Sequence, residues 1–197
     1  MSDFSNFFGA FFGLFFQLFN LQPMTERICL TRNVYWEAAL AKQSYISQLM
    51  VGYVTKQRAD DVRADERKRK KYGDSTICGC VYARRQFSWT FLVSAHHQNT
   101  ILPGKIWESA QSAADQVLAG WHPGGEWDQA RYYLNPRHTP RRNVCRFKKE
   151  FKFIGSIEDH DFYRELVGDE IEKRKTEPEP EECRKNRGVK KKKTSRG

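Results

Sequence analysis

One glutamate of this sequence stands among neighbours that favour a proton-donating carboxyl. Tyr35 and Trp36 come directly before Glu37, and the apolar run 38–40 follows it. Burial among such side chains disfavours the charged form and raises the pKa of a carboxyl. A carboxyl that stays protonated near pH 7 can protonate the leaving oxygen of a glycosidic bond. The alternative is an ordinary surface glutamate near a helix end.

Side chains that suit a carbohydrate occur later in the chain. Hydroxyl and amide groups can hydrogen-bond sugar hydroxyls and N-acetyl groups, and flat aromatic faces can lie against pyranose rings. The candidate substrate-binding residues are Gln86, Ser88, Trp89, Tyr132, Tyr133, Asn135, His160 and Tyr163. Phe87 and Phe162 are better explained as core residues, and a single histidine is more often structural than functional.

The cysteines give weaker signals. The Cys-Gly-Cys run at 78–80 and the histidine pair at 96–97 invite a zinc site, but this cysteine spacing is too tight for the usual zinc knuckle. A cysteine nucleophile could come from Cys29, Cys78 or Cys145, although no orienting pattern supports one. Cys29 fits a helix core, and five cysteines in 197 residues do not indicate a disulfide scaffold. We therefore expect no metal and no cofactor.

Composition limits the class of protein. The chain has 197 residues, of which 39% are hydrophobic and 29% charged, with 14 Phe, 8 Tyr and 5 Trp. This is enough for one globular domain, and it excludes a fully disordered or collagen-like chain. No apolar run is long and clean enough for a multi-span membrane protein.

The net charge of +10 is concentrated near the C-terminus. Residues 172–197 contribute +6 of it, and from Arg184 onward there are eight basic residues and no acidic one. We expect residues 169–197 to form a disordered basic tail. Together with the basic run 67–71, this tail permits an alternative function, in which the protein binds nucleic acid or a membrane and has no catalytic activity. No recognised reader fold accompanies this charge, so no specific nucleic acid is expected, and an anionic envelope or lipid surface suits the tail equally well.

Residues 4–21 form an apolar segment that holds eight of the fourteen Phe. On a helix, spacings of three and four residues place most of them on one broad face. Asp3 stands where a positive n-region belongs and no small-x-small cleavage site follows, which disfavours a cleaved export signal. We interpret residues 1–23 as a membrane-associating helix. The alternative is an arm that packs on its own domain or on a partner subunit.

Helices are expected to position Glu37. The first covers about residues 25–41, and the second begins at Ser44 as N-cap. A third covers about residues 106–119 and ends at Gly120. The second helix should bury one stripe, formed by Ile46, Leu49, Met50, Tyr53 and Val54.

The remaining segments are shorter or more irregular. Residues 58–74 are expected to be a charged, exposed stretch, and residues 77–93 a loop with one or two strands. Strands are predicted at 130–134 and 144–154, and a short helical turn after His160.

Four segments occur in a characteristic order along the chain. They are residues 33–38 (NVYWEA), 80–90 (CVYARRQFSWT), 117–136 with its YYLNP string, and 154–163 with its closing HDFY. Their order, spacing and the complete Gln-Phe-Ser-Trp-Thr string resemble the SleB-like cell wall hydrolase family, which acts on bacterial peptidoglycan. The resemblance covers about residues 25–166 and places Glu37 at the family's catalytic glutamate.

The resemblance implies a fold and a reaction. The fold would be a mainly helical α+β, lysozyme- or transglycosylase-like single domain over residues 24–168, with a small β-hairpin or sheet. Glu37 would line a groove built from loops 86–90 and 132–136, and would cut peptidoglycan glycan strands between N-acetylmuramic acid and N-acetylglucosamine. Gln43 stands near the family's second acidic position, so a single-glutamate lytic transglycosylase is favoured over a two-carboxylate muramidase.

Analogy extends this interpretation to a biological role. Small size suits a phage endolysin-type enzyme used in host cell lysis. It would act in the bacterial cell envelope or periplasm after release, with the membrane-associated host cytoplasm as the alternative site. Its expected partners are peptidoglycan glycan strands, a membrane through residues 4–21, and an anionic envelope or lipid through the basic tail.

Overall fold

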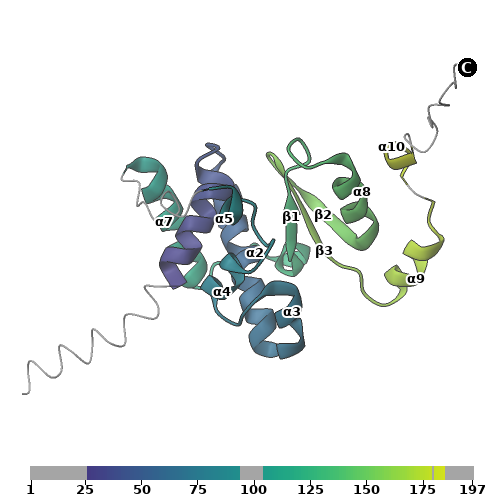
Figure 1. Ribbon diagram of the computed structural model, residues 1–197, viewed down its shortest axis with the longest axis horizontal. Coiled ribbons are helices and arrows are strands. Elements are labelled where there is room, and N and C mark those ends of the chain that lie inside the picture. Colours follow the sequence, from purple (N-terminus) through teal and green to yellow (C-terminus); the bar gives the residue numbers. More distant parts are fainter. Residues whose placement is uncertain (1–25, 94–103, 179, 185–197) are drawn as a thin grey trace, which may run out of the picture. The chain divides into compact units, whose positions relative to one another are not determined.

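The computed structural model describes residues 26–93, 104–178 and 180–184. They fall into two compact units, divided between Asp128 and Gln129. The first unit is built of helices, and the second contains a three-stranded antiparallel sheet (Figure 1). This confirms the expected class, a mainly helical α+β protein with a small sheet. The predicted membrane-associating segment 1–23 lies outside the described residues.

The first unit begins with the helix that carries Glu37. Residues 26–34 are α-helical and continue into a π-helical turn, η1 (Tyr35–Ala39), where one long helix was predicted. Ser44 then caps α2 (Tyr45–Ala64) by accepting a hydrogen bond from the Ser47 N–H, as predicted. The shorter elements that follow are η2 (Glu66–Lys68), α3 (Arg69–Tyr72), α4 (Ile77–Tyr82), α5 (Trp89–Leu92) and η3 (Gly125–Gln129).

Helix α2 is the centre of the first unit and packs against η1 and α7 (Lys105–Leu118). Gly52 permits the close approach, because a Cβ there would stand 3.3 Å from methyl carbons of both Val117 and Val34. Helix α7 ends at the predicted place. Gly120 takes a left-handed φ of +101°, and the N–H groups of Gly120 and Trp121 bond back to the carbonyls of Val117 and Gln116.

The second unit is a sheet of order β1-β3-β2 with a helix beside it. It consists of β1 (Tyr132–Leu134), α8 (Arg141–Glu150), β2 (Phe151–Ile157) and β3 (His160–Glu165). Ile157 pairs with His160, so Glu158 and Asp159 form a two-residue hairpin turn. Helix α8 packs against β2 (Figure 1). Part of the closing segment 154–163 thus builds a strand connection.

Three secondary-structure predictions were wrong. In residues 77–93 the structure has α4 and α5 and no strand, because Thr76 caps α4 by accepting from the Gly79 N–H. The predicted strand 144–154 is helical up to Glu150, since the charged run 141–150 has helical rather than alternating periodicity. The segment after His160 is the strand β3, which β1 and β2 pair on both sides.

The burial of the second helix also differs in part from the prediction. Leu49, Met50, Tyr53 and Val54 are buried as expected, whereas Ile46 in the first turn is 46% exposed. Helix α2 continues to Ala64, through the first part of the stretch predicted to be exposed. Arg58 and Tyr72 of that stretch are buried. A charged residue is easily misjudged from sequence, because burial depends on a partner that lies elsewhere in the chain.

Two disulfides were not foreseen. Cys29 bonds to Cys78 in the first unit, and Cys145 bonds to Cys183 in the second. Helices α9 (Asp169–Thr176) and α10 (Glu181–Arg184) occupy part of the stretch predicted to be a disordered tail. The second disulfide ties α10 to α8.

Candidate active site

Glu37 lies in η1, where the helix of residues 26–34 widens into a π-helical turn. Such turns add one residue to a helix and are frequent at functional sites. Tyr35, Ala38 and Ala39 of the same turn are buried, and Glu37 itself is half-buried. Glu37 is thus partly shielded from water, unlike an exposed surface glutamate.

The Gln-Phe-Ser-Trp-Thr segment lies beside this turn. Trp89 of α5 stacks on Trp36, with ring centroids 6.2 Å apart and an interplanar angle of 18°. Tyr82 meets the Trp89 ring edge-on at 5.8 Å. Trp89 is only 4% exposed. Within this unit it therefore supports the half-buried Trp36, and its own ring is not an open platform for a sugar.

Asn33 fixes the position of Trp89. The Trp89 Nε1–H donates to Asn33 Oδ1 over 2.8 Å, and Asn33 Nδ2 donates to Thr55 Oγ1 over 2.8 Å. All three residues are buried. Asn33 belongs to the segment 33–38, but no role was predicted for it. The sequence feature that could have indicated a role is an asparagine within a predicted helix, since asparagine has a low helix propensity.

Gln86 and Ser88 precede α5 in the same segment. Gln86 Oε1 accepts a hydrogen bond from Arg58 Nη1 at 3.3 Å, and its Nε2 donates to the Lys71 carbonyl at 2.7 Å. Arg58 also lies over the Phe87 ring, which is buried as predicted. The Gln86 amide is thus engaged in fixing the loop, while Ser88 is exposed.

Gln43 occupies the place near the family's second acidic position. Its Oε1 accepts from Ser47 Oγ at 2.5 Å, and its carbonyl accepts from Gln48 Nε2 at 3.1 Å. Gln43 and Gln48 are buried and line a pocket of about 190 Å³ beside Ala39. The structure therefore has a buried amide, held by internal hydrogen bonds, at this place.

The later candidates gather in the second unit. Tyr132 Oη donates to Glu165 at 3.1 Å, and its ring stacks on Phe151 with centroids 4.0 Å apart. Tyr133 lies on the same strand with its ring edge-on to His160 at 5.1 Å. Asn135 follows the strand, and its Oδ1 accepts from the Arg137 N–H at 3.0 Å. It thereby fixes the turn after β1.

His160 and Tyr163 are parts of the core of this unit. His160 is 3% exposed, and burial lowers its pKa to about 4, so the ring is neutral at pH 7. Tyr163 is fully buried, its hydroxyl donates to Asp161, and burial raises its pKa well above the usual range. Phe162 is also buried, as predicted. The candidate residues thus form two sets, one in each unit.

Comparison with known proteins gives one match. Residues 42–163 match the model of a family described as cell wall hydrolase. The chain belongs to the cell wall hydrolase family. No curated protein and no solved structure matches it. The resemblance found in the sequence is therefore confirmed, and the protein is an enzyme that degrades peptidoglycan and acts on the cell envelope. The match contains all candidate residues except Glu37, which lies just before it.

The cysteines of this cell wall hydrolase do not fit the chemistry weighed for them. Cys29, Cys78 and Cys145 are all in disulfides, so none is a thiol nucleophile and Cys78 is no zinc-binding thiolate. Cys80 is buried, and burial raises its pKa to about 11, which makes it a poor nucleophile. Within the described ranges no group of three metal-binding side chains occurs. His96 and His97 lie outside those ranges.

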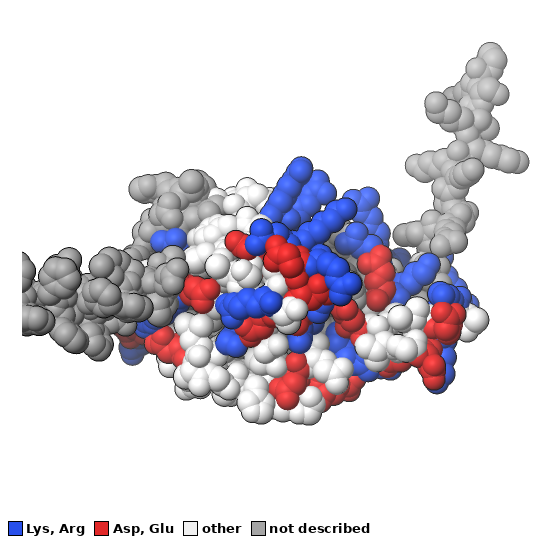
Figure 2. All heavy atoms as spheres, turned by 90° about the horizontal axis from the view of Figure 1, so that it is seen from below, with Lys and Arg blue, Asp and Glu red and all other residues white. Residues whose placement is uncertain are grey.

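Some of the basic side chains near α3 are paired with acidic neighbours. Figure 2 views the side on which α3 lies in Figure 1 and shows Lys and Arg side chains gathered there with Asp and Glu among them. In the basic run 67–71, Arg67 pairs with Asp65 and Arg69 pairs with Glu66. Among the helices that the structure describes, none is long and apolar enough to cross a membrane.

Proposed function

We propose that this cell wall hydrolase is a lytic transglycosylase in which Glu37 acts first as acid and then as base. Its substrate would be the peptidoglycan glycan strand, at the bond between N-acetylmuramic acid and N-acetylglucosamine. The observation that carries the proposal is the half-buried Glu37 in a π-helical turn, braced by the Trp36–Trp89 stack.

In this reaction the carboxyl of Glu37 gives its proton to the leaving glycosidic oxygen as the bond to C1 of the muramic residue breaks. The muramic C6 hydroxyl then attacks C1, and its proton passes to the Glu37 carboxylate. A 1,6-anhydro ring forms, no water is consumed, and Glu37 regains its starting state.

The residue near the family's second acidic position, Gln43, supports transglycosylation over hydrolysis. A common two-carboxylate glycosidase needs a second carboxylate to activate water or to form a glycosyl intermediate. At the corresponding place this chain has Gln43, an amide whose oxygen is taken up by Ser47. An intramolecular nucleophile removes the need for that second carboxylate.

The substrate-binding role of the remaining candidates belongs to the same proposal. Ser88 offers an exposed hydroxyl in the first unit. In the second unit Asn135 offers a half-buried amide and Tyr133 a half-buried ring, whose hydroxyl oxygen is itself buried. Gln86 and Trp89 would act by holding their loop and the Glu37 turn in position, and Tyr132, His160 and Tyr163 by holding the groups of the second unit.

The proposed place of action is the periplasm or another oxidising part of the cell envelope. Disulfides persist in such compartments and are rare in a reducing cytoplasm, and this chain has two. Host lysis by a phage-type enzyme, membrane contact through residues 4–21 and envelope binding by the basic tail extend the proposal. Residues 4–21 and the tail after Arg184 lie outside the described ranges.

Replacement of the proton donor tests the mechanism. Glu37→Gln keeps the size of the side chain but removes its acid, so clearing of a peptidoglycan suspension should fall by about 10²- to 10⁴-fold. The matched control is Glu66→Gln on η2, an exposed glutamate that should leave activity unchanged. Thermal unfolding checks that both variants fold. Full activity of Glu37→Gln would remove this residue from the mechanism.

Mass spectrometry of the wild-type products tests the reaction type. An anhydro product is lighter than the hydrolysed one by one water, about 18 Da. Muropeptides with free reducing ends would instead show a hydrolase.

A further inference from the structure

A groove of about 330 Å³ lies in the first unit at the junction of α4 and α5. This volume is at the lower end of the range of small-molecule sites. The groove combines two cationic side chains with aromatic and hydroxyl groups. Its lining residues are Tyr82, Arg84, Arg85, Thr90 and Phe91.

The two arginines are presented by a tight, fixed turn. The Gln86 N–H bonds to the Ala83 carbonyl at 3.1 Å, and Arg85 has a left-handed φ of +67°. This conformation is unfavourable for a residue with a Cβ. The hydrogen bonds of the Gln86 amide to Arg58 and Lys71 hold the end of the turn. Gln86 therefore anchors the loop that displays Arg84 and Arg85.

Both guanidinium groups are available to a ligand. Arg84 and Arg85 are exposed, and neither has an ion pair within the part of the chain that the structure describes. Other arginines of this unit do have such pairs, for example Arg27 with Asp115 and Arg63 with Asp60. Two adjacent cations without a carboxylate partner favour an anionic ligand.

The groove is also close to the proposed catalytic turn. Its wall residue Tyr82 contacts Trp89, and Trp89 stacks on Trp36, the neighbour of Glu37. The Tyr82 hydroxyl is additionally bonded by Arg32, from the helix that leads to Glu37, at 3.3 Å. An anionic group bound in the groove would therefore lie to one side of a glycan strand held at Glu37.

Phe91 gives the groove an apolar edge, and the next residue in the chain, Leu92, is exposed as well. They are 64% and 74% exposed, which is unusual for side chains of this size. An ion of small size would not need such an apolar edge. A peptide with both carboxylates and aliphatic parts would use the apolar edge and the guanidinium groups together.

We propose that this groove binds the peptide stem of peptidoglycan through its carboxylates. The inference depends on the proposed function, since the stem is attached to the muramic residue next to the bond that Glu37 would cut. In a strand that carries its stems, the lactyl carboxyl group of each muramic residue is amide-bonded to the peptide, so the stem carboxylates are the anionic groups of the substrate. Arg84 and Arg85 are then specificity-determining residues that select strands still carrying peptides.

Binding of defined muropeptides tests the proposal without relying on cleavage. The full-length Glu37→Gln protein is titrated with a disaccharide-tetrapeptide, with the same molecule whose carboxylates are amidated, and with the peptide-free disaccharide whose lactyl carboxylate is amidated. We expect the free-acid muropeptide to bind about 10-fold or more tightly than the other two. Arg84→Gln with Arg85→Gln should abolish that preference and leave binding of the peptide-free disaccharide unchanged.

Two variants make the result specific. Arg141→Gln with Arg142→Gln removes the same charge from an adjacent exposed pair in the second unit and should keep the preference. Arg84→Lys with Arg85→Lys keeps the charge but loses the planar guanidinium groups. This variant should retain only part of the preference for the free-acid muropeptide. Unfolding temperatures establish that each protein is folded.

Several outcomes would overturn the proposal. Equal binding of free-acid and amidated muropeptides would do so, as would an equal loss with the Arg141 and Arg142 control. Binding of anionic phospholipid vesicles that depends on Arg84 and Arg85, without a muropeptide preference, would assign the groove to a membrane instead. Full cleavage activity of a Glu37→Gln protein that keeps the muropeptide preference would contradict the proposed function alone.

Discussion

Asn33 is the residue on which the arrangement around Glu37 most depends. It is buried between Trp89 and Thr55, and it hydrogen-bonds both. Asn33→Ala leaves the Trp89 Nε1–H without its acceptor, so the free energy of unfolding should fall by about 2–4 kcal/mol. Peptidoglycan clearing should fall as well, because Trp89 no longer braces Trp36.

Denaturant unfolding measures this loss. The control is Asn143→Ala on α8, a half-buried asparagine whose replacement should cost less than about 0.5 kcal/mol. If Asn33→Ala also lowered the free energy of unfolding by less than about 0.5 kcal/mol, the hydrogen bond to Trp89 would not be structurally important.

His160 makes stability depend on pH. Its folded pKa is lowered to about 4 by burial, against an ordinary value of 6.5 in an unfolded chain. Between these values the unfolded chain binds the additional proton, so stability is complete above about pH 6.5 and decreases as the pH falls toward 4. The decrease reaches about 3 kcal/mol at most for this one group.

Unfolding measured from pH 7.5 to 4 should show this slope in the wild-type protein. His160→Gln removes the titrating ring and should flatten the part of the profile between pH 6.5 and 4. An unchanged profile in that variant would mean that His160 is accessible to protons in the folded protein.

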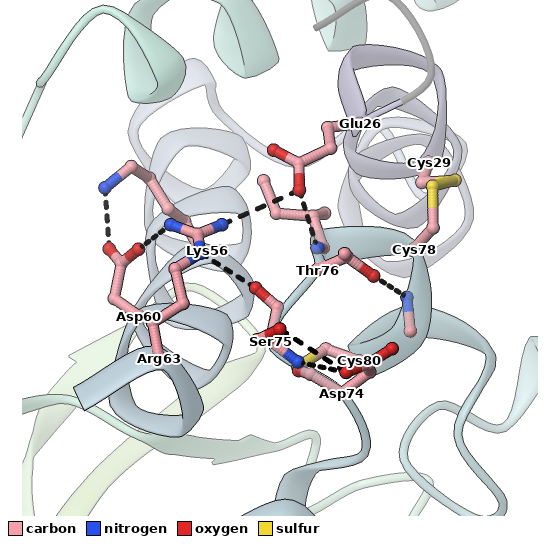
Figure 3. A network of polar contacts seen from close by, with 12 residues as sticks. Glu26, Cys29, Lys56, Asp60, Arg63, Asp74, Ser75, Thr76, Cys78 and Cys80 are labelled. Carbon is pink, nitrogen blue, oxygen red and sulfur yellow. Dashed lines mark hydrogen bonds and ion pairs between the residues drawn. A yellow bond between two sulfur atoms is a disulfide. The ribbon is translucent and has the colours of Figure 1, made fainter. Parts of the chain in front are cut away.

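The element that carries Glu37 is attached to the rest of the first unit by more than apolar packing. The Cys29–Cys78 disulfide joins the helix of residues 26–34 to α4 (Figure 3). Near it, Glu26 accepts from the Ile77 N–H at 3.3 Å, and Arg63 of α2 donates to the Ser75 carbonyl at 2.8 Å. These contacts connect three elements from distant parts of the sequence.

Removal of this disulfide should therefore destabilise the catalytic turn. The bond closes a separation of 49 residues. A loop of that length corresponds to about 4 kcal/mol in the chain-entropy model. Cys29→Ser with Cys78→Ser should lower the unfolding temperature and the rate of peptidoglycan clearing.

Reduction provides the matched experiment. A thiol reductant should slow peptidoglycan clearing by the wild-type enzyme. In the protein with Ser at positions 29 and 78, the reductant should cause no further decrease through this disulfide. Equal activity of oxidised and reduced wild-type protein would contradict a role for the bond in positioning Glu37.

For the molecule as a whole, charge is distributed unequally between the folded units and the C-terminus. Residues 185–197 contain seven basic and no acidic side chains. Deletion of this segment keeps Cys183 and its disulfide, so the second unit should remain folded. The deletion should weaken binding to anionic phospholipid vesicles or to peptidoglycan sacculi at low salt, where charge attraction is strongest. The difference from the wild type should shrink as salt rises, because salt screens this attraction.

Co-sedimentation at low and high salt measures this effect. Replacing Lys190, Lys191, Lys192 and Lys193 by Gln keeps the length of the tail and should reproduce most of the loss. A difference between deletion and wild type that persists in about 0.5 M salt would indicate contacts other than charge.

Much of the fold was accessible from the sequence. The Ser44 cap, the helix that ends at Gly120 and the strand predicted at 130–134 depend on local capping and periodicity. All three occur, the strand over the shorter range 132–134. The family followed from the order of four short segments, because their residue types and spacing are specific when taken together. Local patterns failed for residues 77–93 and 144–154, where short apolar or charged runs fit more than one secondary structure.

What the sequence determined by itself was the family, the mainly helical class and Glu37 as the candidate acid. Only the tertiary structure decided which cysteines form disulfides, that Trp89 is buried against Trp36, and that Asn33 and Gln86 hold other residues in place. The physical reason is that helix caps and periodicity act between residues a few positions apart. A disulfide, a buried hydrogen bond or a groove between two helices depends on residues that only folding brings together.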